Sequence, residues 1–129
     1  MTRINSRQKG AAGEREAANF LNSLGFTARR AVQNGVTDGR DIVVDDLPNL
    51  YFEVKRSQSV SMETSALMDA IMQAEKKAKG RASCVLWRRN NERWKMTFVY
   101  PALGAVTVYH ADDICKCLKM LNKEGAGDE

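Results

Sequence analysis

Apolar and polar positions alternate along the chain with two periods, one typical of helices and the other of strands. The helical period, with apolar residues three to four positions apart, marks three segments. We expect these helices at about residues 11–24, at about 62–79, and from residue 111 or 112 onward. Gly25 and Gly80 follow the first two segments, and glycine commonly ends a helix because it adopts positive φ readily.

Short runs of β-branched and aromatic residues predict six strands. A turn signal separates the second run from the third, which favours an antiparallel hairpin between them. The order α-β-β-β-α-β-β-(β)-α therefore predicts an α/β protein with a central sheet flanked by helices. The expected strands are residues 26–32, 41–44, 50–56, 83–87, 94–100 and 106–109.

The length of 129 residues predicts a single domain, 1–129, with a small core. Residues 1–9 are polar and basic, so we expect a flexible arm there, and we expect the Gly-rich acidic residues 124–129 to fray. No apolar run approaches the roughly 20 residues of a membrane span. The first residues lack the apolar core of a signal peptide, so we expect a cytoplasmic protein.

Charge and cysteine content narrow the picture further. The chain has a formal net charge of +4 and a pI of about 9.1, which is compatible with a polyanionic partner. Its three cysteines are an odd number without a disulfide framework, so we expect reduced thiols. Cys115, Cys117 and His110 would make a poor zinc site, because positions i and i+2 of a helix point apart.

The strand expected at residues 50–56 carries the strongest chemical signal. Side chains alternate across a strand, so Tyr51, Glu53 and Lys55 share one face. A carboxylate and an ammonium on a core strand are costly to bury without a partner or a function. Taken alone, the pattern also fits a surface ion pair on an edge strand. Asp41, at the start of the neighbouring strand, favours a functional site.

Asp41 and Glu53 lie twelve residues apart across the expected hairpin, so both carboxylates can converge at one end of the sheet. Hard oxygen ligands of this kind bind Mg²⁺, which keeps several waters and takes few protein carboxylates. The peptide carbonyl of Val54 is a further candidate ligand, and Glu14 can reach the metal from the first helix, directly or through water. Lys55 is placed to orient an attacking water or to stabilise charge on a phosphate.

Several other residues have less specific roles. Glu16 borders the same apolar stripe as Glu14, and periodicity favours Glu14 only slightly. Gln73 lies on the second helix, where simple solvation is the main alternative to a role in the site. Trp87 and Trp94 flank a turn, so we expect them to be cross-strand partners in the core.

The pattern of Asp41, a hairpin and then Glu53-Val54-Lys55 resembles the PD-(D/E)XK nucleases, with Glu14 as the acid on the helix. Arg40 stands where that superfamily usually has a proline. The stretch of residues 9–16, followed by Phe20-Leu21 and Leu24-Gly25-Phe26, is similar to the opening of archaeal-type Holliday junction resolvases and their phage relatives. The resemblance covers about residues 7 to 90.

This resemblance implies a restriction-endonuclease-like mixed sheet and an endonuclease that resolves four-way DNA junctions in recombination and repair. It implies Glu14, Asp41 and Glu53 as metal-site acids and Lys55 as the catalytic lysine, with Mg²⁺ as cofactor and Mn²⁺ as a substitute. It also implies a homodimer, because a four-way junction is cut at two symmetric positions. A phage origin, which would put the protein in the host cytoplasm, is suggested only by analogy.

The DNA contacts and the alternatives follow from the same comparison. A hydroxyl in the loop before Asp41 assists in some resolvases, and Thr37 is the one present here. A restriction-like, flap or single-strand nuclease of the same fold is an alternative, and so is a catalytically idle DNA-binding protein. The residues expected to contact DNA are Arg3, Arg7, Lys9, Arg15, Arg30 and Arg40.

Overall fold

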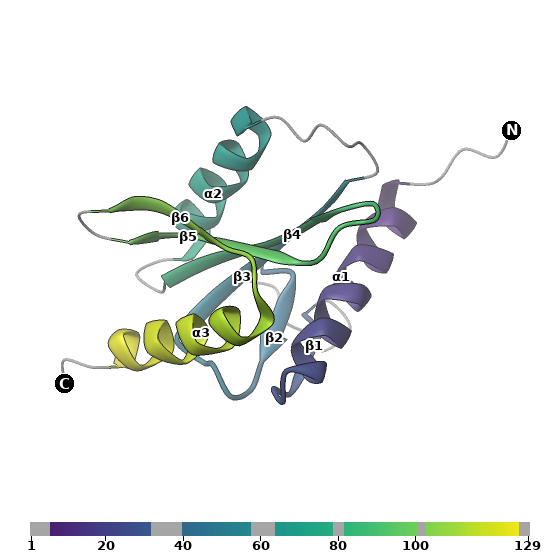
Figure 1. The fold of residues 1–129 in the computed structure, drawn as a ribbon. Coiled ribbons are helices and arrows are strands. Elements are labelled where there is room, and N and C mark those ends of the chain that lie inside the picture. The colour runs from purple at the N-terminus through teal and green to yellow at the C-terminus, as the bar shows by residue number, and fades with distance from the viewer. Residues whose placement is uncertain (1–5, 32–39, 58–63, 79–81, 101–102, 127–129) are drawn as a thin grey trace, which may run out of the picture.

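A computed structural model describes residues 6–31, 40–57, 64–78, 82–100 and 103–126, except for the side chains of residues 6–10, 57, 64–66, 77 and 126. Within these ranges the chain forms one mixed sheet of six strands and three helices (Figure 1). None of the described helices is long and apolar enough to cross a membrane. The elements are α1 (Ser6–Ser23), β1 (Ala28–Arg30), β2 (Ile42–Val44), β3 (Leu50–Ser57), α2 (Thr64–Ala78), β4 (Ala82–Arg89), β5 (Lys95–Tyr100), β6 (Gly104–Val108) and α3 (Ala111–Ala126).

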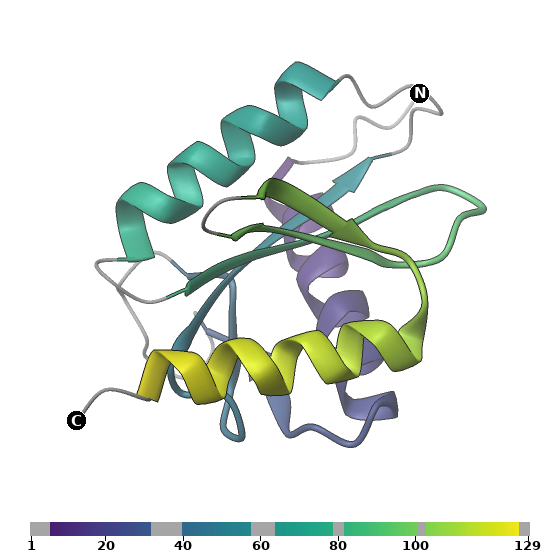
Figure 2. The ribbon, with the colours of Figure 1, turned by 60° about the vertical axis from the view of Figure 1, so that its left-hand side comes forward.

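The strands lie in chain order across the sheet, from β1 to β6. Each neighbouring pair is antiparallel except β3 and β4, which are parallel and joined through α2. Figure 2 shows α2 on one face of the sheet and α3 on the other. The fold is therefore the α/β fold with a mixed central sheet that the element order predicts, and the expected β2–β3 hairpin is confirmed.

Alternation along β3 divides the interior into two clusters. Leu50 and Phe52 pack with residues of α1 and α3, whereas Tyr51 packs with residues of α2 and β4. All three side chains are buried. The predicted face of Tyr51, Glu53 and Lys55 is therefore the face that α2 covers.

The first helix ends where the sequence predicts, at a glycine. Gly25 has a φ of 99°, and its N–H donates to the carbonyl of Asn22 at 3.0 Å. The N–H of Phe26 donates to the carbonyl of Leu21 at 3.2 Å, which completes a Schellman motif. Leu21 and Phe26 are both buried in the cluster between α1, α3 and the sheet.

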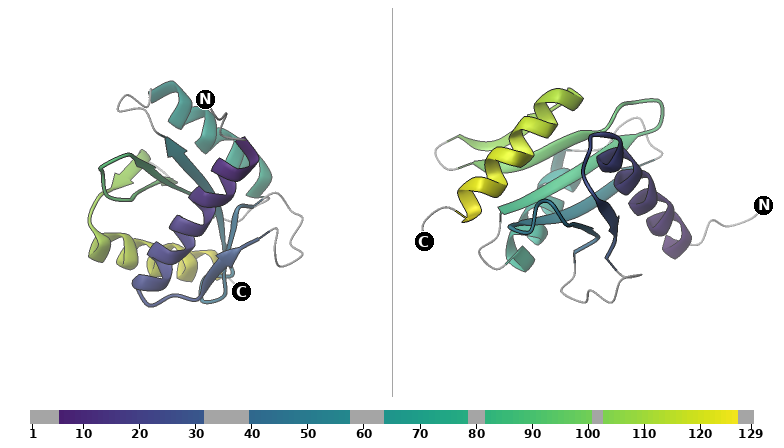
Figure 3. Two further views of the ribbon diagram at one scale, coloured as in Figure 1. Left: turned by 90° about the vertical axis from the view of Figure 1, so that its right-hand side faces the viewer. Right: turned by 90° about the horizontal axis from the view of Figure 1, so that it is seen from below.

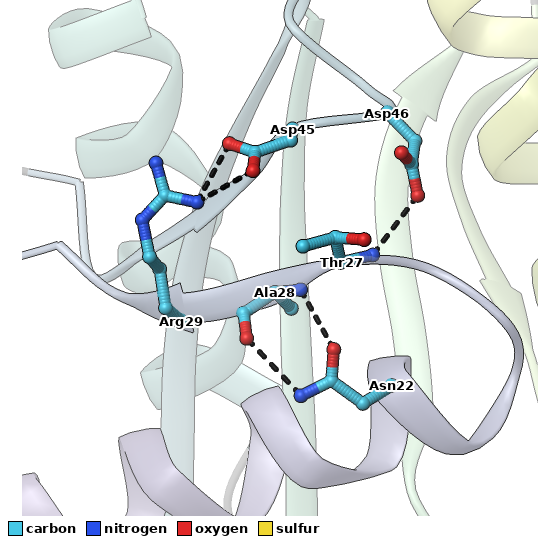
Figure 4. A network of polar contacts seen from close by, with 6 residues as sticks. All are labelled: Asn22, Thr27, Ala28, Arg29, Asp45 and Asp46. Carbon is cyan, nitrogen blue, oxygen red and sulfur yellow. Dashed lines mark hydrogen bonds and ion pairs between the residues drawn. The ribbon is translucent and has the colours of Figure 1, made fainter.

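A polar network fixes β1 against the end of α1 and the β2–β3 turn (Figure 4). The side-chain amide of Asn22 donates to the carbonyl of Ala28 at 3.1 Å and accepts from its N–H at 2.7 Å. Arg29 binds Asp45 at 2.7 Å, and the N–H of Thr27 donates to the carboxylate of Asp46 at 2.9 Å. Because Arg29 faces solvent on this side, alternation directs Arg30 toward α1.

Helix α1 lies against β3 and β4 through one close contact and one shared carboxylate. A Cβ added at Gly13 would lie 2.9 Å from the Cβ of Arg56, so only glycine fits at this position. Three residues later, Oε1 of Glu16 accepts from Arg56 at 3.2 Å and from Arg88 at 2.9 Å. Figure 3 shows α1 from the side and from below.

Three expectations about order and packing need correction. Helix α1 begins at Ser6 and not near residue 11, because Arg, Gln and Lys are good helix formers even where no apolar stripe marks the turn, so the basic arm is shorter than expected. Helix α3 continues to Ala126, into the segment expected to fray. Trp87 and Trp94 are both buried but are not partners: Trp87 packs under α2, and Trp94 stacks on Phe20 of α1.

The mismatch between the two tryptophans follows from the register. Trp87 lies opposite Lys95, the residue after Trp94, and because neighbouring residues of a strand point to opposite faces, Trp94 points to the other face of the sheet. The remaining element boundaries agree with the expected ranges to within two residues.

Replacing Gly13 by alanine is expected to destabilise the protein. At an ordinary helical position this change stabilises by up to about 1 kcal/mol, but here the new methyl group meets the Cβ of Arg56 and forces α1 away from β3. We expect a loss of roughly 1–3 kcal/mol in the free energy of unfolding, measured by urea denaturation. Ala12→Ser, an exposed control on the same helix, should change it by less than about 0.5 kcal/mol. A Gly13→Ala protein as stable as the parent would show that the contact is not tight.

Candidate active site

Asp41 is held between two strands by its own backbone. Its N–H donates to the carbonyl of Phe52 and its carbonyl accepts from the N–H of Ala31, both at 3.0 Å. Its side-chain Oδ2 accepts the N–H of Val54 at 2.8 Å. The position of the carboxylate is therefore set by the pairing of β2 with β3 and does not depend on a flexible loop.

Glu53 lies beside Asp41 in the same sheet. The antiparallel register places Ile42 opposite Phe52, so Asp41 comes opposite Glu53. The Glu53 side chain is buried, with 7% of the residue exposed. A side-chain hydrogen bond links the two carboxyl groups. The twelve-residue spacing in the sequence thus brings the two predicted acids together.

Asp41 and Glu53 are two neighbouring acids in a site that is largely shielded from water, and both conditions affect the pKa of Asp41. Burial, more than any other cause, raises the pKa of Asp41 to about 7, and the negative charge of Glu53 and the hydrogen bond to it act in the same direction. The N–H of Val54 and the positive charge of Lys55 act to lower this pKa. A proton or a cation between the carboxylates would relieve the repulsion.

Lys55 completes the set on β3. It lies two residues beyond Glu53, on the same face and about 7 Å further along the strand by the usual rise per residue. Its side chain is partly exposed. A cation in that place is close enough to Asp41 to affect the pKa of its carboxyl group. Asp41, Glu53 and Lys55 therefore converge as predicted.

Glu14 reaches the same region from α1 but is held by an arginine. Its Oε1 accepts from Nε of Arg30 at 3.0 Å, and the two side chains are only 17% and 15% exposed. Burial raises the pKa of Glu14, and the negative charge of Asp41 raises it further, while Arg30 opposes both. Of the two glutamates, Glu14 is thus the one that lies near Asp41, since Glu16 binds Arg56 and Arg88 instead.

The fit of a metal ion is partial. Among the described residues no group of three or more His, Cys, Asp or Glu side chains is arranged to hold a metal ion. Two carboxylates, from Asp41 and Glu53, are adjacent, and the third acid, Glu14, is engaged with Arg30. Two hard oxygen donors suit Mg²⁺, which retains several waters.

The predicted DNA-binding residues are dispersed. Arg15 is exposed on α1, Arg40 is partly exposed next to Asp41, and Arg30 is engaged with Glu14. The backbone of Arg7 and Lys9 forms part of α1, but the structure does not describe their side chains. Arg3 lies outside the described residues.

Two further predicted residues do not contribute side chains to the site. Val54 contributes its N–H to Asp41, while its side chain packs on the opposite cluster. Gln73 is exposed on α2, with Asp69 and Met72 around it. Thr37 lies outside the described residues.

Sequence reasoning missed two contributions to this site. One is the N–H of Val54, which any residue except proline would supply, so no side-chain pattern marks it. The other is the ion pair of Arg30 with Glu14. Its signal was present, because Arg29 and Arg30 must face opposite sides of β1, but the partner of each became clear only when α1 was placed over the strand.

Comparisons with known proteins add a likeness of fold at low similarity. No family model matches the sequence, and no curated protein matches it. Among solved structures, the chain is similar to Hjc, a Holliday junction resolvase from the archaeal hyperthermophile Archaeoglobus fulgidus. The match has a TM-score of 0.44 and 20% sequence identity, and it covers 76% of this chain and 85% of that one.

The raised pKa of Asp41 predicts a pH-dependent stability. Between about pH 4 and pH 7 the folded protein holds a proton that the unfolded chain has lost, so the free energy of unfolding should fall as pH rises through this window. Asp41→Asn keeps an acceptor for Val54 and removes the titration. The variant should therefore lose less stability between pH 5 and pH 8, by on the order of 2 kcal/mol, in urea denaturation.

Asp69→Asn, which changes an exposed carboxylate on α2, is the control for this titration and should follow the parent profile. Equal pH profiles for the parent and Asp41→Asn would show that Asp41 does not titrate in that window.

Proposed function

We propose that this protein is a Mg²⁺-dependent endonuclease that hydrolyses phosphodiester bonds in DNA, with four-way junctions as its substrate. The observation that carries the proposal is the buried pair of Asp41 and Glu53 with Lys55 beside it on β3. Two adjacent carboxylates in a poorly hydrated site are unfavourable unless a proton or a cation accompanies them. The amine of Lys55, two residues further along the same face, can stabilise the negative charge that develops on the phosphate during phosphodiester hydrolysis.

Asp41 and Glu53 would hold the metal, with the carbonyl of Val54 and the carboxylate of Glu14 as further ligands. Mn²⁺ should substitute, since it accepts similar oxygen donors. When bound, such an ion lowers the pKa of a water and neutralises charge on a phosphodiester oxygen. The hydrogen bond from the N–H of Val54 orients the carboxylate of Asp41, and the pairing of β2 with β3 keeps Glu53 next to it. The two carboxylates would therefore need little rearrangement to bind a metal ion.

Lys55 would act on the substrate side of this pair. Its ammonium group lies on the same face as Glu53, where it can orient the attacking water or stabilise the negative charge that develops on the phosphate. The carboxylates and the lysine thus have separate tasks, and removing either should impair cleavage without preventing folding.

The Glu14–Arg30 pair suggests an exchange of partners. Glu14 can turn toward a metal only if its bond with Arg30 is replaced, and a DNA phosphate that approaches the site is a candidate replacement partner for Arg30. This exchange would reconcile the assignment of Glu14 as a ligand with that of Arg30 as a DNA contact.

The substrate assignment rests on the resemblance of residues 9–26 to the archaeal-type resolvases and on the basic charge of the chain. A junction is cut at two symmetric positions, so the active species would be a homodimer. Nothing in the described residues resembles a module that reads base edges, which favours recognition of DNA shape and backbone. A role in DNA recombination and repair would follow.

A substrate panel with defined metals tests the proposal. A synthetic four-way junction should be cut in Mg²⁺ or Mn²⁺ and left intact in Ca²⁺ or chelator, and linear, nicked and flapped duplexes of the same sequence should be cut at least about tenfold more slowly. Products are resolved on denaturing gels. Preferential cutting of flaps or single strands would mean that the same active site acts on another DNA substrate. Junction binding without cutting in any metal would indicate a catalytically idle nuclease fold.

Paired acid-to-amide variants test the roles of individual residues. Asp41→Asn and Glu53→Gln should each lower the cleavage rate by at least about 100-fold, because loss of a ligand exceeds the effect of losing an outer partner, while junction affinity in Ca²⁺ stays within a few-fold. Glu14→Gln should also lower the rate. Glu16→Gln, two residues away on the same helix, should leave the rate unchanged and lower only stability, since Glu16 binds Arg56 and Arg88. A normal rate for Asp41→Asn would remove the assignment.

A further inference from the structure

The two edges of the sheet differ in how well they are protected from pairing with another strand. β1 and β6 lie at opposite edges of the sheet (Figure 1). β1 is only three residues long and carries Arg29 and Arg30, both in ion pairs with acids of neighbouring segments. β6 is five residues long, Gly-Ala-Val-Thr-Val, and pairs with β5 without a bulge. Charges, proline, bulges and very short length are the usual features that keep an edge from pairing, and β6 has none of them.

Large apolar side chains are exposed at both ends of β6. Leu103, directly before the strand, is 73% exposed, and Tyr109, directly after it, is 53% exposed. The strand between them is exposed in its first two residues and half-buried in the other three. The stretch from Leu103 to Tyr109 contains no charged residue. It therefore combines an unprotected backbone edge with apolar side chains on either side of it.

A second copy of the chain fits this edge by two-fold symmetry. An antiparallel pair of β6 strands centred on Val106 places Ala105 opposite Thr107 of the partner subunit. The same register places Leu103 opposite Tyr109 of the partner subunit, since both lie three residues from the centre. Each exposed apolar side chain thus covers the other, and the contact occurs twice in one dimer. Because the stretch is uncharged, no like charges meet across the pair.

Pairing at this edge would also leave both active sites on the same side of the sheet. The Oγ1 atoms of Thr107 and Thr97 lie 2.8 Å apart, and Thr97 accepts from Nε1 of Trp87, which packs under α2. These side chains therefore lie on the face that carries Glu53 and Lys55. The two-fold axis of an antiparallel strand pair is perpendicular to the sheet, so this face points the same way in both copies. A substrate that is cut at two symmetric positions needs two active sites that face it together.

We propose that β6, with Leu103 and Tyr109 at its ends, is the surface through which two copies of this chain form a dimer with one continuous sheet. The inference rests on the proposed function, which takes a homodimer as the active species, and it names the surface that forms this homodimer. A foreign extended peptide would meet the same edge, but a second copy brings a tyrosine and a leucine to the matching positions by symmetry.

The size of the contact sets the expected strength of the dimer. Specific interfaces bury about 800 Å² on each partner, and a five-residue strand with two flanking side chains lies at the low end of this range. We therefore expect a dissociation constant in the micromolar range and not in the nanomolar range.

Charge exchange between the two flanking positions tests the dimer. Sedimentation velocity at protein concentrations from about 1 to about 200 μM gives the dissociation constant without DNA or metal. Leu103→Glu and Tyr109→Lys should each raise it by at least about tenfold, because each lost contact occurs twice. The double variant should bind at least about fivefold more tightly than either single variant, since the introduced charges are opposite in sign and face each other. Met72→Lys on α2, where the methionine is 65% exposed, is the control and should leave the constant unchanged.

The outcomes separate this inference from the proposed function. A parent that stays monomeric up to about 200 μM overturns the inference, whatever other chain the edge accepts, and leaves cleavage by the monomer to be judged in the substrate panel. A dimer that Met72→Lys dissociates and Leu103→Glu does not would lie on α2, which also overturns it.

Weaker association in both single variants without recovery in the double variant would overturn the pairing of Leu103 with Tyr109 of the partner subunit. Weaker association in both, with recovery in the double variant, supports the inference. That result stands even if the parent cuts no DNA, in which case only the proposed function fails.

Discussion

The structure depends on holding two carboxylates side by side where water is scarce. Asp41 is fixed by backbone bonds to Ala31 and Phe52 and by the N–H of Val54, and Glu53 is buried next to it in the central part of β3. The sheet cannot separate them without losing the register that pairs β2 with β3. The two carboxylates therefore repel each other in the folded protein whenever both are ionised, as the raised pKa of Asp41 reflects, and binding of a proton or a cation would relieve that repulsion.

Helix α1 contributes two acids with different roles: Glu16 ties the helix to β3 and β4, and Glu14 lies near Asp41. Glu16 joins Arg56 and Arg88 on two parallel strands, and Gly13 lets the helix come close enough for that contact. Glu14 lies on the other side of the same apolar stripe, toward β1, where it meets Arg30. Two glutamates separated by one residue thus have different surroundings, because a helix turns them about 200° apart. Only Glu14 is placed to influence Asp41.

Sequence reasoning could predict the strands, the hairpin and the convergence of Asp41, Glu53 and Lys55, because all three follow from short-range alternation and one tight connection. Its periodicity favoured Glu14 over Glu16 only slightly, since both border the apolar stripe and their surroundings depend on which strand each meets. The error over Trp87 and Trp94 has the same origin. Burial could be inferred from residue type, but a register one residue away from the expected one sends the two rings to opposite faces.

The parallel pairing of β3 and β4 determines where the β4–β5 turn lies relative to Asp41, Glu53 and Lys55. If β3 and β4 were antiparallel, the residues after Lys55 and the C-terminal end of β4 would lie at opposite ends of the two strands. Here the α2 crossover makes both strands run the same way, so Ser57 comes opposite Arg89 and the β4–β5 turn begins where β3 ends. A residue on that turn is therefore placed by topology close to the end of β3 that carries Lys55.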